Sequence, residues 1–339
     1  MLFSHLQIDP YAATPKYSQL ANAILSGIEE GELRYNDLLP SINELSAELD
    51  ISRDTVERCY KYLKQQKIID SVPGKGYYIK SKENKKRLKI FLLFNKLSTH
   101  KKIIYDSFIE TLGSEAIVDF YIYNNDYKLF EKIITERKEG YTHYVIIPHF
   151  IEGSNYAHNL INTLPKEKLL LLDKKLSFIV GNYASVYQRF EDDIYEALEQ
   201  ALERLGKYKM LRLIFPKESY YPKEIVSGFL RFCHQYTFNY TVSDKFNEKD
   251  LEKGSVYITV LEDDLVSLIE KIKDSKLKIG KDVGVISYNE TPLKRIIMNG
   301  ITTISTDFKQ MGIETAKMII NNEIKSVEIP FNIFLRDSL

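Results

Sequence analysis

The sequence has only two cysteines, Cys59 and Cys233, and each stands alone. This excludes a disulfide framework and a Cys-x-x-Cys metal pattern, and it suits a reducing cytoplasm. No apolar run approaches membrane-spanning length, and the first residues lack a basic segment followed by a long apolar one. We therefore expect a cytoplasmic protein that has neither a signal peptide nor a membrane anchor.

The common catalytic signatures are also missing. The sequence contains no Gly-x-x-x-x-Gly-Lys-[Ser/Thr], no His-Glu-x-x-His, no Gly-x-Ser-x-Gly and no Gly-x-Gly-x-x-Gly after a strand. Excess charge of one sign is lacking as well, because 47 basic side chains balance 47 acidic ones. We predict a protein that is not an enzyme and that needs no metal ion or other cofactor.

Charge is nevertheless unevenly placed along the 339 residues, a length that suggests two or three compact units. Residues 1–50 hold two basic and eight acidic side chains, net −6, whereas residues 51–87 hold eleven basic and four acidic ones, net +7. A local basic cluster of this kind is typical of a surface that neutralises phosphates. A solvated basic surface without a partner is the alternative.

Capping residues predict two short helices in and before this cluster. Ser41 and Glu44 form a Ser-x-x-Glu capping box, so a helix should begin there and end near Leu49. Ser52 is a second N-cap candidate, followed by apolar residues at helical spacing. Two helices joined this closely indicate a helix-turn-helix, whose second helix enters the major groove of DNA.

A hairpin is predicted directly after these helices, with strands at Ile68–Val72 and Tyr77–Lys80. Its tip contains Gly74 and Gly76, which permit positive φ and close backbone approach. Lys75 between them is then placed to reach a phosphate or the minor groove. The alternative is that Gly-Lys-Gly serves only as a turn.

The residues of this region, roughly 12–80, resemble the GntR family of bacterial transcription regulators. The motifs that carry the resemblance are Pro15-Lys16-Tyr17, Gln19-Leu20-Ala21, Gly27-Ile28, Gly31, Leu38-Leu39-Pro40-Ser41, Glu44-Leu45, Ser52-Arg53-Asp54-Thr55-Val56, Tyr60 and Gly74-Lys75-Gly76-Tyr77. The resemblance implies a winged helix-turn-helix that binds double-stranded operator DNA.

The same resemblance implies which residues contact DNA. The candidates are Arg34, Ser41, Asn43, Ser52, Arg53, Thr55, Glu57, Gly74, Lys75 and Gly76. Many members of the family have arginine where this chain has Asn43 and Glu57, so we expect a different base preference. Asn43 is suited to adenine, whereas Glu57 either accepts from cytosine or pairs with Arg53 one turn back.

From Leu88 onward, strands alternate with amphipathic helices. The predicted strands are Lys89–Phe94, Val118–Tyr123, Tyr144–Pro148, Leu169–Asp173, Leu211–Phe215, Asn239–Val242, Ser255–Val260 and Val283–Tyr288. The predicted helices are Lys101–Leu112, Leu129–Lys138, Phe190–Leu205, Lys223–Tyr236, Leu265–Lys273 and Met311–Asn321. Repeated βαβ units require parallel sheets covered on both faces, which predicts an α/β fold with two similar lobes.

This second part, about 88–339, resembles the effector domains of LacI-type regulators. The motifs are Leu170-Leu171-Leu172-Asp173, Ser227-Gly228-Phe229, Glu262-Asp263-Asp264, Gly280 to Asn289, Thr302 to Phe308 and a final strand at Leu335-Arg336-Asp337-Ser338. The resemblance implies a two-lobed fold like that of periplasmic sugar-binding proteins, with three crossovers and a ligand cleft. We therefore expect a DNA-binding domain at 1–80 that includes an N-terminal arm at 1–16, a linker at 81–87 and an effector-binding and dimerisation domain at 88–339.

In such a fold, ligands bind at the carboxyl ends of the strands. The predicted effector-binding residues are Asp173, Tyr220, Glu262, Asp263, Asn289 and Thr306. Carboxylate, amide and hydroxyl groups suit a sugar, and Tyr220, Tyr221 or Phe308 would supply a flat wall. Three converging carboxylates would repel an anion, so a neutral sugar is expected. A sugar phosphate is the alternative if Lys96, His149 or Lys174 points inward. For Asp263 the alternative is a helix cap.

Together the two resemblances indicate arabinose-repressor-type architecture. We expect a homodimeric transcriptional repressor whose operator affinity changes when a small carbohydrate binds in the cleft. Two alternatives are a C-terminal domain that only dimerises, and one that binds a phosphorylated sugar or another metabolite.

Overall fold

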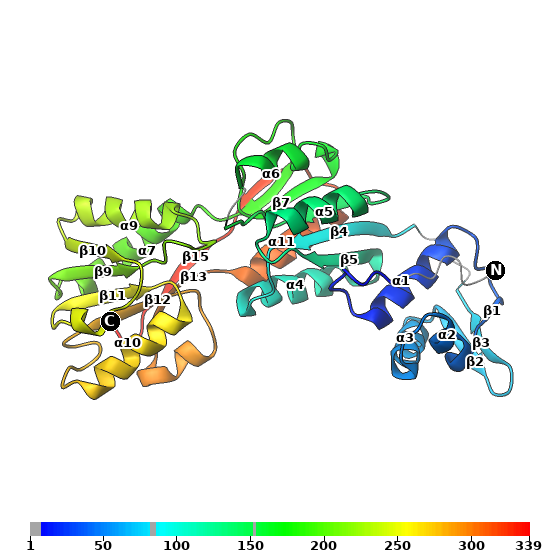
Figure 1. The fold of residues 1–339 in the computed structure, drawn as a ribbon, viewed down its shortest axis with the longest axis horizontal. Helices are drawn as coiled ribbons and strands as arrows, with labels where there is room; N and C mark the ends of the chain where they lie inside the picture. Colours follow the sequence, from blue (N-terminus) through cyan, green and yellow to red (C-terminus); the bar gives the residue numbers. More distant parts are fainter. Residues whose placement is uncertain (1–7, 82–85, 152–153) are drawn as a thin grey trace.

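The computed structural model of the protein describes residues 8–81, 86–151 and 154–339. Residues 1–7 of the expected arm and 82–85 of the expected linker lie outside the described residues. A small head and two α/β lobes follow one another along the longest axis (Figure 1). We call these parts the head (α1 to β3), the N-lobe (the sheet that contains β4) and the C-lobe (the sheet that contains β9). Among the described residues, no helix is both long and apolar enough to cross a membrane.

The head is a helix-turn-helix followed by a hairpin, as the capping residues predicted. Its elements are α1 Lys16–Glu29, β1 Leu38–Leu39, α2 Ile42–Glu48, α3 Arg53–Gln65, β2 Ile69–Val72 and β3 Gly76–Ile79. Ser41 and Glu44 form the complete capping box at the start of α2, and Ser52 caps α3. The three strands form an antiparallel sheet in the order β1-β3-β2.

The N-lobe has a parallel six-stranded sheet in the order β14-β8-β7-β6-β4-β5. Its strands are β4 Leu88–Phe94, β5 Ala116–Ile122, β6 His143–Ile146, β7 Leu169–Asp173, β8 Ala184–Tyr187 and β14 Ser326–Glu328. Its helices are α4 Thr99–Leu112, α5 Tyr127–Arg137, α6 Ser154–Ile161 and α11 Phe308–Ile320. Apolar side chains of α4 and α11 form the core on one face, and those of α5 and α6 form the core on the other.

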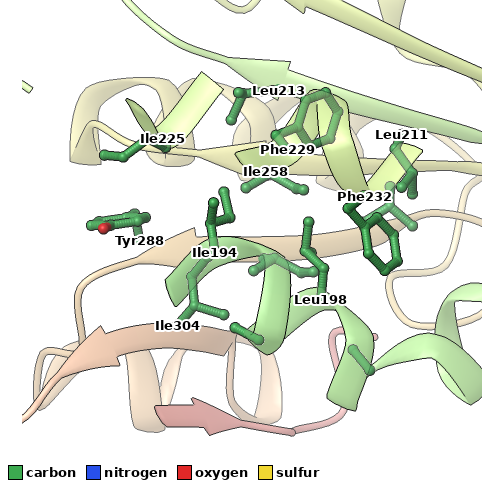
Figure 2. Packing of buried hydrophobic residues seen from close by; sticks show 14 of the residues in the cluster. Ile194, Leu198, Leu211, Leu213, Ile225, Phe229, Phe232, Ile258, Tyr288 and Ile304 are labelled. Carbon is green, nitrogen blue, oxygen red and sulfur yellow. The ribbon is translucent and has the colours of Figure 1, made fainter. Parts of the chain in front are cut away.

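The C-lobe repeats this plan, with the strand order β10-β9-β11-β12-β13-β15. Its strands are β9 Met210–Ile214, β10 Asn239–Ser243, β11 Ser255–Thr259, β12 Gly284–Tyr288, β13 Thr302–Thr306 and β15 Phe331–Phe334, of which β15 is antiparallel to β13. Its helices are α7 Phe190–Gln200, α8 Leu202–Leu205, α9 Glu224–Gln235 and α10 Glu262–Asp274. Figure 2 shows side chains of α7 and α9 packed over the sheet. The helix α10 covers the opposite face.

Three segments cross between the lobes: from β8 to α7, from β13 to α11 and from β14 to β15. The final strand expected at 335–338 is wrong, because β15 occupies Phe331–Phe334 and the chain then turns. The end is instead anchored by the Ser338 hydroxyl, which donates to Val285 O and accepts from Thr302 N. The helix expected at 190–205 is divided at Ala201 into α7 and α8.

The head is docked on the N-lobe through the residues that precede α1. Ala12 forms an antiparallel bridge with Tyr121, and the Ala13 N–H donates to Phe120 O at 2.6 Å. The Phe120 N–H in turn donates to the Thr14 hydroxyl at 2.8 Å. Because β5 is the edge strand of its sheet, this segment covers backbone groups that would otherwise be unpaired.

Side chains reinforce the same contact. Arg87 pairs with Glu29 of α1 at 2.9 Å, and both side chains are largely buried. Asp9 pairs with Arg137 of α5 at 2.9 Å. Ile117 of β5 packs into the apolar core of the head. The part of the expected arm that the structure describes is therefore an element of the junction between head and N-lobe.

Gly228 is a direct test of the packing in the C-lobe, because it lies where α9 meets α7. A Cβ added there would stand 2.0 Å from Glu191 O and 2.6 Å from Ile194 Cγ2. We expect Gly228→Ala to lower the free energy of unfolding by about 1–3 kcal/mol, measured by urea denaturation. Gly206→Ala is the matched control, since its added Cβ would meet nothing closer than 3.6 Å. Equal stability of both variants would contradict this packing.

Candidate DNA-binding surface and interlobe site

The helix α3 buries one face in the head and exposes the other. Its buried residues are Val56, Cys59, Tyr60 and Leu63. The Tyr60 hydroxyl also donates to Pro40 O at 2.7 Å, which ties α3 to the start of α2. Arg53, Glu57 and Lys61 are exposed on the rest of the helix. The head therefore presents an exposed polar face on its second helix, as a helix-turn-helix requires for binding in a groove.

The candidate DNA contacts are exposed except Thr55, which is half-buried. The hydroxyls of Ser41 and Ser52 each accept a hydrogen bond at 3.2 Å from a backbone N–H of the helix they cap. Within the described residues, the side chains of Asn43, Arg53 and Glu57 make no hydrogen bond or ion pair with protein groups. The pairing of Glu57 with Arg53, one of the two alternatives, is therefore not formed.

The hairpin between β2 and β3 places Lys75 at an exposed tip. Gly74 and Gly76 have φ of +78° and +90°, a conformation that residues with a side chain rarely adopt. Part of the basic charge that the sequence suggested for this region is neutralised, however, because the Asp70 carboxylate forms ion pairs with two nearby lysines. Lys80 lies 2.8 Å from Asp70 and Lys64 lies 3.3 Å from it. The hydrogen bond from Lys80 holds the pKa of Asp70 below its ordinary value.

Two adjoining cavities lie between the lobes. The outer one has a volume of about 240 Å³ and the inner one about 20 Å³. The residues that line both are His100, Tyr220, Tyr221, Tyr288 and Asn289. The rings of Tyr220 and Tyr221 stack with centroids 4.6 Å apart, which makes a flat wall on the C-lobe side. We call the two cavities together the interlobe site.

The structure brings five of the six predicted effector residues to this site. Tyr220 and Asn289 line both cavities, Glu262 and Asp263 line the outer cavity, and Asp173 lines the inner one. Glu262 and Asp263 are exposed at the first turn of α10. Thr306 lies apart, because it lines neither cavity and its hydroxyl donates to Gln188 Oε1.

Asp173 is buried in a network of protein groups. Lys101 Nζ lies 3.5 Å from its carboxylate, His149 Nε2 donates to Oδ2 at 2.8 Å, and Gln188 donates to Oδ1. Burial would raise the pKa of Asp173, but the charge of Lys101 and these hydrogen bonds outweigh it, so the pKa lies below its ordinary value. Burial also lowers the pKa of His149, which favours its neutral form. Asp173 therefore connects three other residues that line the inner cavity, Lys101, His149 and Gln188.

Three lysines line the site: Lys96 was named for the sugar-phosphate alternative, whereas Lys101 and Lys294 were not among the predicted residues. Lys101 and Lys294 are buried, and Lys96 is half-buried. Lys294 donates to Tyr288 O at 3.0 Å and to Asn289 O at 2.8 Å, and it lies 3.8 Å from Glu262. Two of the three carboxylates thus have a lysine nearby. These lysines offset the repulsion between the carboxylates and an anionic ligand, which was the reason for predicting a neutral sugar.

Two polar atoms in the wall of the site have no partner. Asn289 and Tyr288 are 7% and 2% exposed, and within the described residues Asn289 Oδ1 and the Tyr288 hydroxyl make no hydrogen bond. A buried polar atom without a partner costs about 1–3 kcal/mol, which a ligand would recover. A larger cavity of about 380 Å³ lies between head and N-lobe, but its buried Gln19 bonds to Asp9 and Thr14. The interlobe site is therefore the better candidate for a ligand.

Comparison with known proteins identifies the head. Residues 16–79 match the model for bacterial regulatory proteins of the gntR family. These residues form a gntR-type DNA-binding domain. The chain is 36% identical to the transcriptional repressor YtrA of Bacillus subtilis over 22% of its own length, and it spans 57% of YtrA. That relative is thus matched over little more than half its length.

Two further similarities extend beyond the head. The arabinose metabolism transcriptional repressor of Geobacillus stearothermophilus is 22% identical, and the match covers 96% of each chain. A LacI family transcriptional regulator from Silicibacter pomeroyi has a similar structure, with a TM-score of 0.60 and 16% identity over 74% of this chain and 98% of that one. A gntR-type head is therefore joined here to a two-lobed fold of the LacI type.

The buried ion pair of the site leads to a prediction about stability. Lys101→Met would leave the Asp173 carboxylate buried without its cation, and we expect a loss of about 3–5 kcal/mol in the free energy of unfolding, measured with urea. Lys102→Met on the same helix is the control, because Lys102 is exposed and, among the described residues, pairs only with exposed Asp106, so the change should be about 0–1 kcal/mol. Similar values for both variants would refute the role given to Lys101.

Proposed function

We propose that the protein is a transcriptional repressor that acts in the cytoplasm as a homodimer. Residues 1–80 bind double-stranded operator DNA, 81–87 are a linker, and 88–339 bind the effector and dimerise. The effector is a small carbohydrate that binds between the lobes and changes the affinity for the operator. The exposed face of α3 and the hairpin between β2 and β3, both in the head, support the DNA-binding half of this proposal.

The observation that carries the sensing half is the pair of unpartnered buried atoms in the interlobe site. Asn289 Oδ1 can accept a hydrogen bond from a ligand hydroxyl, and the Tyr288 hydroxyl can donate one to a ligand oxygen. Glu262 and Asp263 offer further acceptors at the rim, and Tyr220 offers a flat apolar face. Together these groups suit a sugar, and the Geobacillus relative is named for arabinose metabolism.

Ligand binding can change the affinity for DNA because residues of both lobes line the site and the head is docked on the N-lobe. Lys96 and His100 come from the N-lobe, whereas Tyr220, Glu262 and Asn289 come from the C-lobe. A ligand that contacts both sides favours the arrangement in which the lobes are close. The head follows the N-lobe through its pairing with β5.

A dimer would place two heads on the two halves of an operator. The C-lobe exposes apolar side chains on α10 and in the segment between β12 and β13, which a second copy would cover. These are Val266, Leu293 and Ile296. If the C-terminal part only dimerises, no ligand will stabilise the protein, whereas a sensor gains stability from its effector by mass action.

Arg53 tests the DNA-binding half. It begins α3 with an exposed side chain that has no hydrogen-bond or ion-pair partner in the described part of the chain. Arg53→Ala should therefore weaken operator binding by about 1–3 kcal/mol, measured by fluorescence anisotropy. Arg58→Ala is the matched control on the same helix, because the Arg58 guanidinium lies 5.0 Å over the ring of Tyr17 and thus faces α1. A larger loss in the control would show that a different face of α3 binds DNA.

A titration of operator binding against pentoses, hexoses and their derivatives tests the sensing half. We expect at least one sugar to change operator affinity by about 5–150-fold, the usual range of allosteric coupling. Asn289→Ala should reduce this response and leave operator affinity without sugar unchanged, because Asn289 follows β12 in the C-lobe, and the C-lobe and the head lie at opposite ends of the molecule (Figure 1). If no sugar changes operator affinity, the protein does not sense carbohydrates.

A further inference from the structure

One end of the interlobe site carries a cation without a counterion. Lys96 is half-buried, lines the outer cavity and, within the described residues, makes no ion pair. Its ammonium lies 4.1 Å over the ring of Tyr220, and burial lowers the pKa of Lys96. Lys101 and Lys294 differ in this respect, because each has an acidic partner within 4 Å. An unpaired charge in a partly buried site is unfavourable unless a ligand supplies its counterion.

The N-terminus of α4 lies at the same end of the site. Ser98 stands at the N-cap without a side-chain cap bond, and Ser98, Thr99 and His100 line the outer cavity with Lys96. The first N–H groups of a helix have no partners within the helix, and its dipole places partial positive charge there. Helix N-termini with these properties bind anions. Burial lowers the pKa of His100 to about 3, so at neutral pH His100 adds no charge of its own.

The opposite wall independently indicates that the site takes a ligand with hydroxyl groups. Asn289 and Tyr288, both more than nine-tenths buried, direct an unpartnered acceptor and an unpartnered hydroxyl at the same cavity. The carboxylates of Glu262 and Asp263 lie on the C-lobe side, at the start of α10. The site is therefore polarised, with a free cation on the N-lobe side and hydroxyl-binding groups on the C-lobe side.

We infer that the interlobe site takes a sugar that bears one anionic group, either a carboxylate or a phosphate. Lys96 and the first turn of α4 bind the anionic group, while Asn289, Tyr288 and Glu262 bind the hydroxyls. At about 240 Å³ the outer cavity is smaller than sites for drug-sized ligands, which fits a monosaccharide derivative. The inference rests on the proposed carbohydrate sensing and adds the charge of the effector.

Isothermal titration calorimetry of the full chain with matched sugars tests the inference. Each set contains a neutral sugar, its phosphate and its acid: D-glucose, D-glucose 6-phosphate and D-gluconate, with the corresponding D- and L-arabinose sets. In at least one set, an anionic member should bind about tenfold or more tightly than its neutral parent. The advantage should shrink at high salt. Whether the phosphate or the acid binds distinguishes the two anionic groups.

Lys96→Met removes the cation and keeps most of the side-chain length. It should weaken binding of the anionic member about tenfold and change binding of the neutral parent less than about twofold. Lys102→Met, an exposed position on α4 outside the site, should change neither affinity.

The possible failures can be told apart. If the neutral member of a set binds as tightly as its anionic derivatives, or if Lys96→Met weakens both equally, the anionic inference is overturned and carbohydrate sensing stands. If no member of any set binds and none shifts operator affinity, the carbohydrate proposal fails and this inference fails with it.

Discussion

The free edge of β5 is the constraint on which the arrangement of the molecule depends. An edge strand presents unpaired N–H and C=O groups, and in this protein Ala12 to Thr14 cover part of that edge. The backbone bonds fix the segment before α1, and the pair of Arg87 with Glu29 fixes α1 itself. The head is therefore held on the N-lobe at several points. These contacts involve residues that precede 82–85 in the sequence and Arg87, which follows them.

This docking determines how a movement of the lobes can affect the head. A head on a flexible tether would respond to the lobes only through its distance from a second head. A docked head turns with the N-lobe, so any rotation of one lobe against the other also changes its orientation. The crossovers that permit such a rotation lie beside the site, where Gln188 bonds both Asp173 and Thr306. Gln188, in the crossover between β8 and α7, thus joins Asp173 of the interlobe site to Thr306 of β13.

Structural features that depend on residues close together in the sequence were predicted, whereas contacts between residues far apart in the sequence were not. The cap of Ser41 with Glu44 and the cap of Ser52 are local, and both helices begin where these residues place them. Phe120 and Thr14, in contrast, are 106 residues apart, and no local pattern pairs them. The strands β8, β13, β14 and β15 were not among the predicted strands, and β14 consists of three exposed or half-exposed residues that carry no clear periodicity.

The site was predicted in part for the same reason. Asp173, Glu262 and Asn289 follow strands, and the parallel topology brings strand ends together, so their positions followed from the fold. Lys101 lies on the apolar stripe of α4 with Ile104 and Phe108, and a lysine on a buried stripe needs a counterion. That pattern was visible in the sequence, but only the structure identifies Asp173 as its partner.

The contacts across the site bear on how strongly the two lobes are held together, and hence on the proposed control by a ligand. Lys174, which is half-buried, lies 3.7 Å from exposed Glu224, and half-buried Lys96 lies over Tyr220. Ion pairs near the surface contribute about 0–1 kcal/mol, and cation–π contacts contribute about 0.5–2 kcal/mol, depending on how far they are buried. These direct links between the lobes are therefore weak compared with the cores of the lobes themselves. A ligand needs only a few kcal/mol of differential binding to control their closure, and hydrogen bonds to Asn289 and Tyr288 together with a counterion for Lys96 are of that size.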